Sequence, residues 1–214
     1  MPSFSADNPS PRWRDLVALY RRMHTEGDGV LEAEKMFAGM PRLEQISHLK
    51  ALVDAHGAKS LLDYGSGKGM QWRMDFNLGD FFDTDEKRLR DFLGLEIVNC
   101  YDPGFEPFSK PPPMRYDGVI CLDVLEHCPE DDIPWILDQI FGYASRFLLA
   151  NIASYPAAKV LANGENAHCT IKPAEWWREN VAVVSAAHPD VRYRIQCREP
   201  SPDGTEIQEI LLEG

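Results

Sequence analysis

Two segments near the start of the chain carry apolar residues at helical spacing. Between residues 11 and 25, charged residues separate the apolar positions Trp13, Leu16, Val17, Leu19, Tyr20 and Met23. Between residues 41 and 56, one face carries Leu43, Ile46, Leu49, Leu52 and Val53. Pro41 suits a first helical turn and Gly57 a helix end. The pattern predicts helices over 11–25 and 41–56, with another turn or two over 31–37.

From residue 59 onward, short apolar runs alternate with segments of helical periodicity. The runs predict four buried strands, at 59–64, 95–101, 117–122 and 146–152. The intervening and following segments predict helices at 85–93, 133–145 and 173–187. Strands that alternate with helices predict an α/β fold, with a mostly parallel sheet and helices on both faces.

The last part of the chain has a different pattern. Residues 191–197 and 206–212 alternate apolar and polar positions, and Ser201-Pro202-Asp203-Gly204 between them favours a turn. These segments predict a C-terminal antiparallel hairpin that closes the sheet.

The length of 214 residues suits one α/β domain with a short addition. We expect a loose tail over residues 1–10, a helical cap over 11–40 and the main domain over 41–214. The tail has neither a cationic start nor an apolar stretch, so it is not a signal peptide. No apolar run approaches the ~18 residues that span a bilayer, so no membrane partner is expected.

The charge balance bears on the partner. Lys and Arg number 22 against 34 Asp and Glu, a formal net charge of −12. Nucleic-acid binding requires cations that neutralise phosphates, so nucleic acid is disfavoured and a small-molecule, glycan or protein substrate is favoured. The five cysteines are odd in number and form no C-x-x-C, which indicates free thiols in a reducing, cytoplasmic location.

A glycine-rich motif follows the first predicted strand, Asp63-Tyr64-Gly65-Ser66-Gly67-Lys68-Gly69. Alternate glycines let the backbone turn sharply and approach a ligand. A dinucleotide fingerprint needs a glycine where Met70 stands, and a Walker A loop needs Ser or Thr where Gly69 stands. Nicotinamide and nucleoside-triphosphate ligands are therefore disfavoured, and an acid before the bend suits a ligand with a cationic amino group.

Asp102 ends the second predicted strand, where a carboxylate can accept hydrogen bonds from ribose hydroxyls. It lies further from the glycines than the usual ~20 residues, because an aromatic and acidic insertion separates the two strands. Asp83 and Asp85 in that insertion are alternative ribose ligands, and a turn-forming role for Asp102 before Pro103 also stays open.

Two further motifs carry titratable groups. Asp123, Glu126 and His127 follow the third strand, at the sheet edge where open α/β folds bind ligands. His168 lies in a long loop over 153–173, and long loops in compact domains are usually functional. It is a candidate general base or a structural anchor. Trp176 and Trp177 line an acceptor pocket or belong to the core. No metal site is expected, since the spacing of Cys121, His127, Cys128 and His168 matches no standard zinc pattern.

The segments LLDYGSGKG, YDP and YDGVICLDVLEH, with the final hairpin, resemble class I S-adenosylmethionine-dependent methyltransferases over residues 45–214. The resemblance implies a Rossmann-like fold. It also implies S-adenosylmethionine as cofactor, S-adenosylhomocysteine as product, and cofactor binding by Asp63, Gly65, Ser66, Gly67, Gly69, Asp102, Leu122 and Asp123. Glu126 and His127 would lie near the acceptor as catalytic residues, together with His168. Tyr20, Met23 and His24 of the cap are candidates to close over the cofactor.

One departure from the family concerns the segment before the third strand. Only a Pro-rich stretch over residues 105–116 separates Asp102 from that strand, so the sheet should be trimmed on this side. Phe105 or Phe108 could then stack on the adenine in place of the missing contacts.

The function that follows from the resemblance is O- or N-methylation of a small-molecule or sugar-like acceptor. Two alternatives are a non-catalytic S-adenosylmethionine-binding protein on the same fold and a nucleotide-dependent oxidoreductase. The sequence specifies neither the acceptor nor the oligomeric state.

Overall fold

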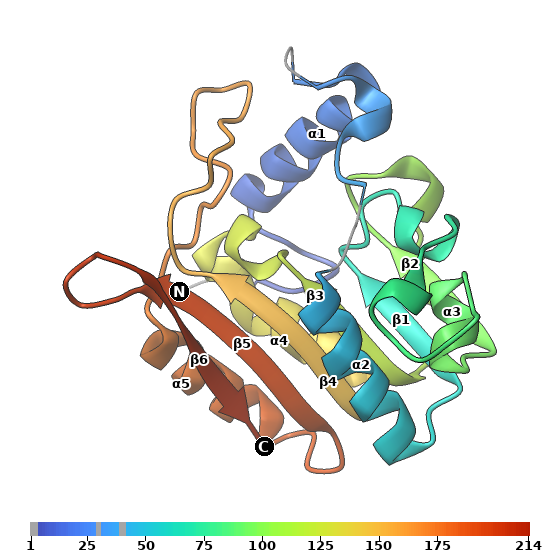
Figure 1. The fold of residues 1–214 in the computed structure, drawn as a ribbon. Coiled ribbons are helices and arrows are strands. Elements are labelled where there is room, and N and C mark those ends of the chain that lie inside the picture. Colours follow the sequence, from blue (N-terminus) through green and yellow to red (C-terminus); the bar gives the residue numbers. More distant parts are fainter. Residues whose placement is uncertain (1–3, 29–30, 39–41) are drawn as a thin grey trace.

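The computed structural model describes residues 4–28, 31–38 and 42–214. Its centre is a sheet with the strand order β2-β1-β3-β4-β5-β6 (Figure 1). The strands are β1 Ser60–Tyr64, β2 Ile97–Tyr101, β3 Tyr116–Leu122, β4 Ala144–Ala153, β5 Arg192–Pro200 and β6 Ile207–Glu213. The first five run parallel and β6 pairs antiparallel with β5, which confirms the predicted sheet and C-terminal hairpin.

Helices cover both faces of the sheet. The helices on the faces are α2 Leu43–His56, α3 Leu89–Leu93, α4 Ile133–Tyr143 and α5 Ala174–Ser185, whereas α1 Pro11–Glu26 lies outside these layers. Alternate strand residues face opposite sides. Leu61 and Ile120 pack with α2 and α3 on one face, whereas Leu62 and Val119 pack with α4 and α5 on the other. The predicted layers are therefore confirmed.

The strand order agrees with a shortened doubly wound sheet. The Rossmann order is 3-2-1-4-5-6. Removal of strand 3 from one edge leaves 2-1-4-5-6, which corresponds to β2-β1-β3-β4-β5 in this chain. Between β2 and β3 the chain forms only a 3-10 turn, Glu106–Phe108. The trimmed sheet predicted from the Pro-rich stretch is confirmed, and the order reverses between β1 and β3, where such sheets bind ligands.

The helix predicted over 85–93 is shorter than expected. It begins only at Leu89, because residues 85–87 are charged and exposed while Leu89 and Leu93 are buried. The bend after β1 leads instead into a 3-10 turn, Met70–Trp72. No α-helix therefore starts at the bend.

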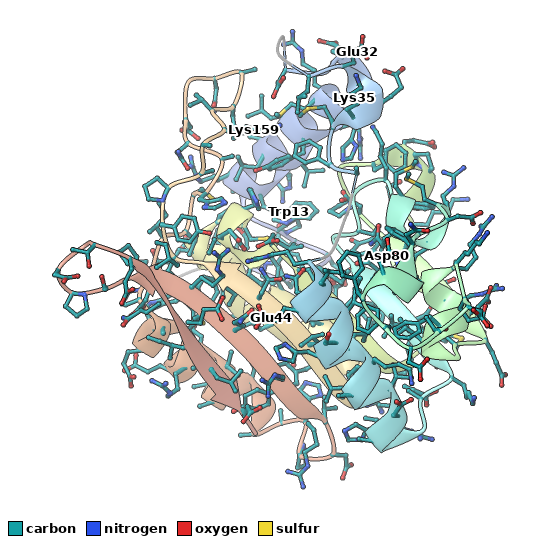
Figure 2. All side chains as sticks on the ribbon, viewed as in Figure 1. Trp13, Glu32, Lys35, Glu44, Asp80 and Lys159 are labelled. Atoms are coloured by element: carbon teal, nitrogen blue, oxygen red, sulfur yellow. The ribbon has the colours of Figure 1, made fainter. Side chains whose placement is uncertain are left out.

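The first helix lies beyond the carboxyl ends of the central strands (Figure 1). Leu16 and Met23 form a small separate core with Met36 and residues of the 153–173 loop. Trp13, near the start of α1, packs on Trp135 of α4 with ring centroids 5.8 Å apart. Figure 2 labels its side chain below the ribbon of α1. No helix in the described ranges is both long and apolar enough to cross a membrane.

The start of α1 is fixed by Ser10, which belongs to the segment expected as a tail. Its side chain caps the helix by accepting from Trp13 N at 3.0 Å. Its amide and hydroxyl donate to the two carboxylate oxygens of buried Asp132, at 3.0 and 2.5 Å. The chain is therefore attached to the main domain just before the cap begins.

Gly118 provides a test of the packing that holds the central strands. A Cβ there would lie 2.2 Å from the ring of Phe147, which is fully buried on β4. We expect Gly118→Ala to lower the free energy of unfolding by about 1–3 kcal/mol, because the ring must shift. Thermal denaturation followed by circular dichroism would measure this as a decrease of roughly 2–4 °C per kcal/mol.

The matched control is Gly142→Ala in α4, whose Cβ would meet only His188 at 3.9 Å. Alanine is the better helix former, so this variant should melt at or above the wild-type temperature. Equal melting temperatures for Gly118→Ala and the wild type would contradict the packing described here.

Candidate functional site

The bend after β1, residues 65–69, is a glycine-rich turn. It lies between the cap and the ends of β1 and β3, the two strands at which the strand order reverses. Gly65, Gly67 and Gly69 have φ values of 76°, 55° and 59°, a region that favours glycine. Neighbours on both sides leave no space for side chains: a Cβ on Gly65 would lie 2.4 Å from Val124, and one on Gly67 would lie 2.2 Å from the carbonyl oxygen of Phe37. The motif is glycine-rich because other elements approach it closely.

Backbone hydrogen bonds fix the bend to β2 and to the cap. The amides of Gly65 and Ser66 both donate to the Tyr101 carbonyl, at 2.7 and 3.1 Å. The amide of Lys68 donates to the Phe37 carbonyl at 2.8 Å. The ends of β1 and β2 and the residues before α2 are thereby held together around one point.

Gly69 differs from the other two glycines. It lines neither of the cavities beside the bend, and a Cβ there would lie 2.8 Å from Cys100 Sγ and 3.3 Å from the Phe108 ring. Its small size therefore serves packing against β2 and the following turn.

Two adjoining cavities lie on either side of the bend. The larger, about 290 Å³, is bounded by α2, α3 and the ends of β1 and β3. The smaller, about 140 Å³, lies under α1, and its walls include Asp102, Gly104 and Val124. Both are lined by Phe37, Gly65, Gly67, Asp123 and His127. The two spaces thus meet above the bend, at the carboxyl edge of the sheet.

Asp63 is fully buried at the end of β1 and lines the larger cavity. Its Oδ2 accepts from Gln71 Nε2 at 2.5 Å and from Trp72 Nε1 at 2.7 Å. Burial raises the pKa of this carboxyl to about 7, although the two donors act in the opposite direction. Among the described residues Oδ1 has no donor, and Gln71 Oε1 has no partner either. Two hydrogen-bond acceptors therefore remain for a donor in this cavity.

Asp102 follows β2 and lines the smaller cavity. Gly67 N donates to its Oδ2 at 2.9 Å and Gly104 N donates to its Oδ1 at 2.8 Å. Burial raises its pKa to about 6 against these two donors. Each oxygen keeps a further lone pair, so the carboxylate can accept two hydroxyl groups. The alternative acids Asp83 and Asp85 are exposed and line neither cavity.

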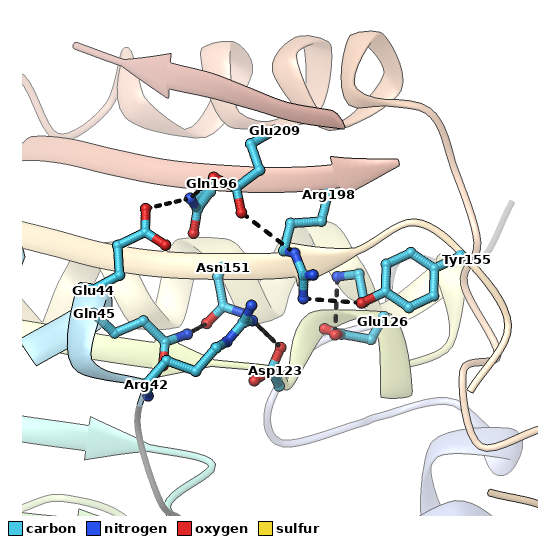
Figure 3. Close-up of polar contacts among 11 residues, drawn as sticks. Arg42, Glu44, Gln45, Asp123, Glu126, Asn151, Tyr155, Gln196, Arg198 and Glu209 are labelled. Carbon is cyan, nitrogen blue, oxygen red and sulfur yellow. Dashed lines mark hydrogen bonds and ion pairs between the residues drawn. The ribbon is translucent and has the colours of Figure 1, made fainter. Parts of the chain in front are cut away.

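Asp123 follows β3 where the cavities meet. It is a non-glycine residue with φ 54°, and such backbone strain clusters at functional sites. Its Oδ1 accepts from Asn151 Nδ2, and Arg42 lies 3.7 Å away. Asn151 Oδ1 in turn accepts from Gln45 Nε2 at 2.8 Å (Figure 3). The side chains of α2 and β4 thus orient a carboxylate at the mouth of the cavities, with Leu122 lining the larger one beside it.

Glu126 lies three residues after Asp123 and is fully buried. Its Oε1 accepts from Ala153 N at 3.0 Å, whereas its Oε2 has no partner among the described residues (Figure 3). Burial, and secondarily the charge of Asp123, raises its pKa to about 8.

His127 and His168 lie against each other, with ring centroids 4.8 Å apart. Nδ1 of His127 lies 2.9 Å from the Ala167 carbonyl and 2.8 Å from the Tyr20 hydroxyl. Nδ1 of His168 lies 2.5 Å from the Tyr155 carbonyl. Burial, with the neighbouring His168, lowers the pKa of His127 to about 4, so its imidazole is neutral at physiological pH. The fold thus brings all three residues predicted to be catalytic to one place.

Comparison with known proteins shows a likeness to solved structures but not to known sequences. No protein-family model and no curated protein sequence matches this chain. A solved structure does match: the 1,6-didemethyltoxoflavin-N1-methyltransferase of Burkholderia thailandensis, crystallised with 1,6-didemethyltoxoflavin and S-adenosylhomocysteine. The likeness covers 95% of this chain and 89% of that one, at a TM-score of 0.50 and 15% sequence identity.

This chain has the class I methyltransferase fold. The mostly parallel sheet and the antiparallel β5–β6 hairpin agree with that assignment. At 15% identity the likeness concerns the fold alone, so the roles of individual residues rest on the geometry of this chain.

Within the methyltransferase fold, the cap contributes residues that the sequence identified only in part. Tyr20 and His24 line the smaller cavity, whereas Met23 is buried in the core of the cap. Phe37, which the sequence did not single out, lines both cavities with a φ of 49°. It packs edge-on against Tyr20, with ring centroids 5.5 Å apart. The periodicity of the sequence does not predict a positive φ at a phenylalanine.

The aromatic residues expected to stack on adenine or line an acceptor pocket lie elsewhere. Phe105 packs on His24, and Phe108 lines a separate groove behind Gly69; neither lines the two cavities. Trp177 is fully buried under the sheet and Trp176 packs beside it, so both belong to the core. Apolar walls for a ligand come instead from α1 and the turn after β3, through Trp13, Leu16, Val17, Val124 and Pro129.

The cysteines are free thiols, as expected. Cys121 is fully buried in the core, whereas His127 and His168 lie together beside Glu126. Asn151, Gln45 and Gln71 were missed because amides in strands and helices give no signal until the fold places them.

Proposed function

We propose that this chain is an S-adenosylmethionine-dependent methyltransferase that acts on a small-molecule or sugar-like acceptor. The observation that carries the proposal is the pair of carboxylates on either side of the bare bend. Asp63 and Asp102 end adjacent strands, each lines one of two joined cavities, and each has acceptor capacity left. An adenosyl sulfonium has an ammonium at one end and ribose hydroxyls in the middle, which suits this spacing.

In this proposal the methionine part occupies the larger cavity. Its ammonium donates to Asp63 Oδ1 and Gln71 Oε1, which otherwise stay unpaired. The ribose hydroxyls donate to Asp102 in the smaller cavity, and the adenine packs between α1 and the turn after β3. The sulfonium then lies at the junction, beside Leu122 and Asp123, with Gly65, Ser66 and Gly67 beneath it.

The chemistry requires little beyond positioning. An acceptor atom attacks the methyl carbon in line, the carbon–sulfur bond breaks, and its electron pair stays on sulfur to give S-adenosylhomocysteine. Holding the two reactants in contact and excluding water supplies most of the acceleration. Glu126, His127 and His168 line the acceptor side, where a neutral imidazole can accept the proton of a hydroxyl or amine. The 1,6-didemethyltoxoflavin bound by the Burkholderia enzyme supports a small-molecule acceptor.

Two measurements test the proposal. Isothermal titration calorimetry should show one S-adenosylhomocysteine bound per chain and no binding of NAD. NAD is disfavoured because a pyrophosphate is held by a helix N-terminus, and here a 3-10 turn follows the bend. Incubation with methyl-labelled cofactor and a small-molecule cell extract should then pass label to an acceptor.

The outcomes separate the proposal from its alternatives. Absence of S-adenosylhomocysteine binding would refute it. Binding without label transfer across extracts would favour the non-catalytic binding protein, and NAD binding would favour an oxidoreductase.

The raised pKa values of the two carboxylates predict how cofactor binding depends on pH. Both must be ionised to accept from the ammonium and the ribose, and burial raises their pKa to about 7 for Asp63 and about 6 for Asp102. Protonation sets in as pH falls, so affinity should decrease at least about tenfold between pH ~7 and pH ~5.5. The amino group of the ligand stays protonated throughout this interval.

Calorimetric titration with S-adenosylhomocysteine at several pH values would measure the effect. An Asp63→Asn variant should bind weakly and show a flatter profile, because its amide does not titrate. A wild-type affinity that is constant down to pH ~5.5 would show that neither carboxylate holds the ligand in its ionised form.

A further inference from the structure

The three residues on the acceptor side form a cluster with the chemistry of a metal site. Glu126, His127 and His168 each place one ligand-capable atom within 4.8 Å of the other two. Two of them are adjacent in sequence, while the third comes from the 153–173 loop. Their convergence therefore results from the fold and not from their spacing in the chain.

The loop that carries His168 is attached firmly to the segment after β3. The backbone carbonyl of Glu126 accepts from the amides of Cys169 and Thr170, at 2.9 and 3.0 Å. The hydroxyl of Thr170 donates to the Cys128 carbonyl at 2.6 Å, and the amide of His168 donates to Asn166 Oδ1 at 3.0 Å. The relative position of the three side chains is thus fixed from both segments.

Both imidazoles are oriented in the way that metal-binding histidines are. A carbonyl oxygen only accepts, so these contacts are hydrogen bonds when Nδ1 of His127 carries a proton toward Ala167 and Nδ1 of His168 carries one toward Tyr155. The Tyr20 hydroxyl, 2.8 Å from Nδ1 of His127, then donates to the same Ala167 carbonyl at 3.2 Å. This tautomer leaves Nε2 of each ring with its lone pair. A backbone carbonyl behind Nδ1 is a frequent outer partner of a ligating histidine, because it fixes the ring and the tautomer.

The carboxylate supplies the independent observation. Glu126 is fully buried, and its Oε2 has no hydrogen-bond partner within the described part of the chain. A buried polar atom without a partner is destabilising, and the more so when it is charged. The described neighbours of this oxygen leave that cost uncompensated, whereas a cation between it and the two free imidazole nitrogens would remove it.

We propose that Glu126, His127 and His168 bind one divalent first-row transition-metal ion through a carboxylate oxygen and two Nε2 atoms. Two imidazoles and one carboxylate suit zinc, iron or their neighbours, whereas magnesium and calcium prefer all-oxygen sites. Bonds of ~2.1 Å in a tetrahedral site separate the ligand atoms by about 3.4 Å. The ligand atoms lie up to 4.8 Å apart, so the cluster contracts by at most about 1.4 Å on binding the ion, which rotation of side chains accommodates.

The site would specify the acceptor atom of the proposed reaction, and this part rests on the proposed function. Three protein ligands leave a position open toward the cavities, which His127 lines. A hydroxyl bound there loses its proton to solvent more readily, because the ion stabilises the alkoxide. The alkoxide oxygen then forms the new bond to the methyl carbon as the carbon–sulfur pair leaves on sulfur. The geometry thus points to an oxygen acceptor.

Metal binding can be tested on the whole chain without an acceptor. Protein freed of metal with a chelator is titrated with Zn²⁺, Co²⁺ and Mg²⁺ by calorimetry, and Co²⁺ binding is also followed by its visible ligand-field absorption. We expect one Zn²⁺ or Co²⁺ per chain and no comparable binding of Mg²⁺. Glu126→Gln and His168→Ala should each weaken Zn²⁺ binding at least tenfold and change the Co²⁺ spectrum.

His188→Ala is the matched control, since His188 pairs with a carboxylate, Asp138, at 2.9 Å away from both cavities. It should bind Zn²⁺ as the wild type does. Circular dichroism of each variant shows whether it is folded. If a variant does not fold, the number of Zn²⁺ or Co²⁺ ions bound per wild-type chain tests the proposed site. No stoichiometric binding of Zn²⁺ or Co²⁺ to the wild type, or equal binding by the folded Glu126 and His168 variants, would overturn the site.

Titration of the same metal-free protein with S-adenosylhomocysteine separates this proposal from the proposed function. If S-adenosylhomocysteine binds but neither Zn²⁺ nor Co²⁺ does, only the metal site is overturned. If Zn²⁺ or Co²⁺ binds but S-adenosylhomocysteine does not, only the methyltransferase proposal is overturned. Label transfer that stops on chelation and returns with Zn²⁺ or Co²⁺ supports the oxygen-acceptor role. Transfer that is indifferent to metal overturns that role.

Discussion

Asp102→Ala is expected to lower the affinity for S-adenosylhomocysteine at least about 100-fold. The variant removes the carboxylate that would accept from both ribose hydroxyls, and hydrogen bonds to a charged group contribute about 1.5–3 kcal/mol each. It also frees the amides of Gly67 and Gly104, which hold the bend and the following turn in place. Calorimetry with the purified variant would measure the loss, with circular dichroism as a check on folding.

Asp83→Ala and Asp85→Ala are the controls for this prediction. Both acids lie in the insertion between β1 and β2 and were alternative ribose ligands by sequence, but both are exposed and line neither cavity. Their affinities should match that of the wild type. A normal affinity for Asp102→Ala, or a large loss in either control, would place the ribose elsewhere.

His168→Ala is expected to slow methyl transfer by about 10²–10⁴-fold while the affinity for S-adenosylhomocysteine stays within about twofold. His168 lines neither cofactor cavity but faces His127 on the acceptor side, so its loss affects the acceptor and not the cofactor. The rate loss is expected in either case: if the imidazole takes the acceptor proton, or if it holds an ion that promotes loss of that proton to solvent. Transfer of labelled methyl to a fixed extract fraction would measure the rate.

His188→Ala serves as the control for the histidine substitution as well, because its side chain packs on Phe141 beside α4. It should transfer label at the wild-type rate. An unchanged rate in His168→Ala would assign this histidine to the anchoring of its loop, through its bond to the Tyr155 carbonyl.

Much of the fold follows from the sequence because its signals are local. The apolar runs of β1 to β4 and the periodicity of α1 and α2 place these elements within a few residues of their observed bounds. The Pro-rich stretch after Asp102 correctly indicated a missing outer strand, since it offers neither a helical nor a strand period. The helix expected before β2 was too long because charged residues 85–87 were counted with the two buried leucines that follow them.

The site was accessible to sequence reasoning only where a motif sits at a strand end. Asp63, Asp102 and Asp123 could be placed because carboxyl ends of parallel strands meet at one edge. The contact between His127 and His168 could not, since it depends on how the long loop folds back over β3. Phe37 and Gln71 gave no signal at all, because a strained aromatic and a buried amide become meaningful only beside the bend.

The central claim is that the two cavities flanking the bare bend hold an adenosyl cofactor. A crystal structure of the chain with S-adenosylhomocysteine tests it most directly. We predict density with the amino group against Asp63 and Gln71, the ribose on Asp102 and the sulfur beside Asp123. Cavities that hold no ligand because Phe37 and other cap side chains fill them, or ligand density at another site, would contradict the account.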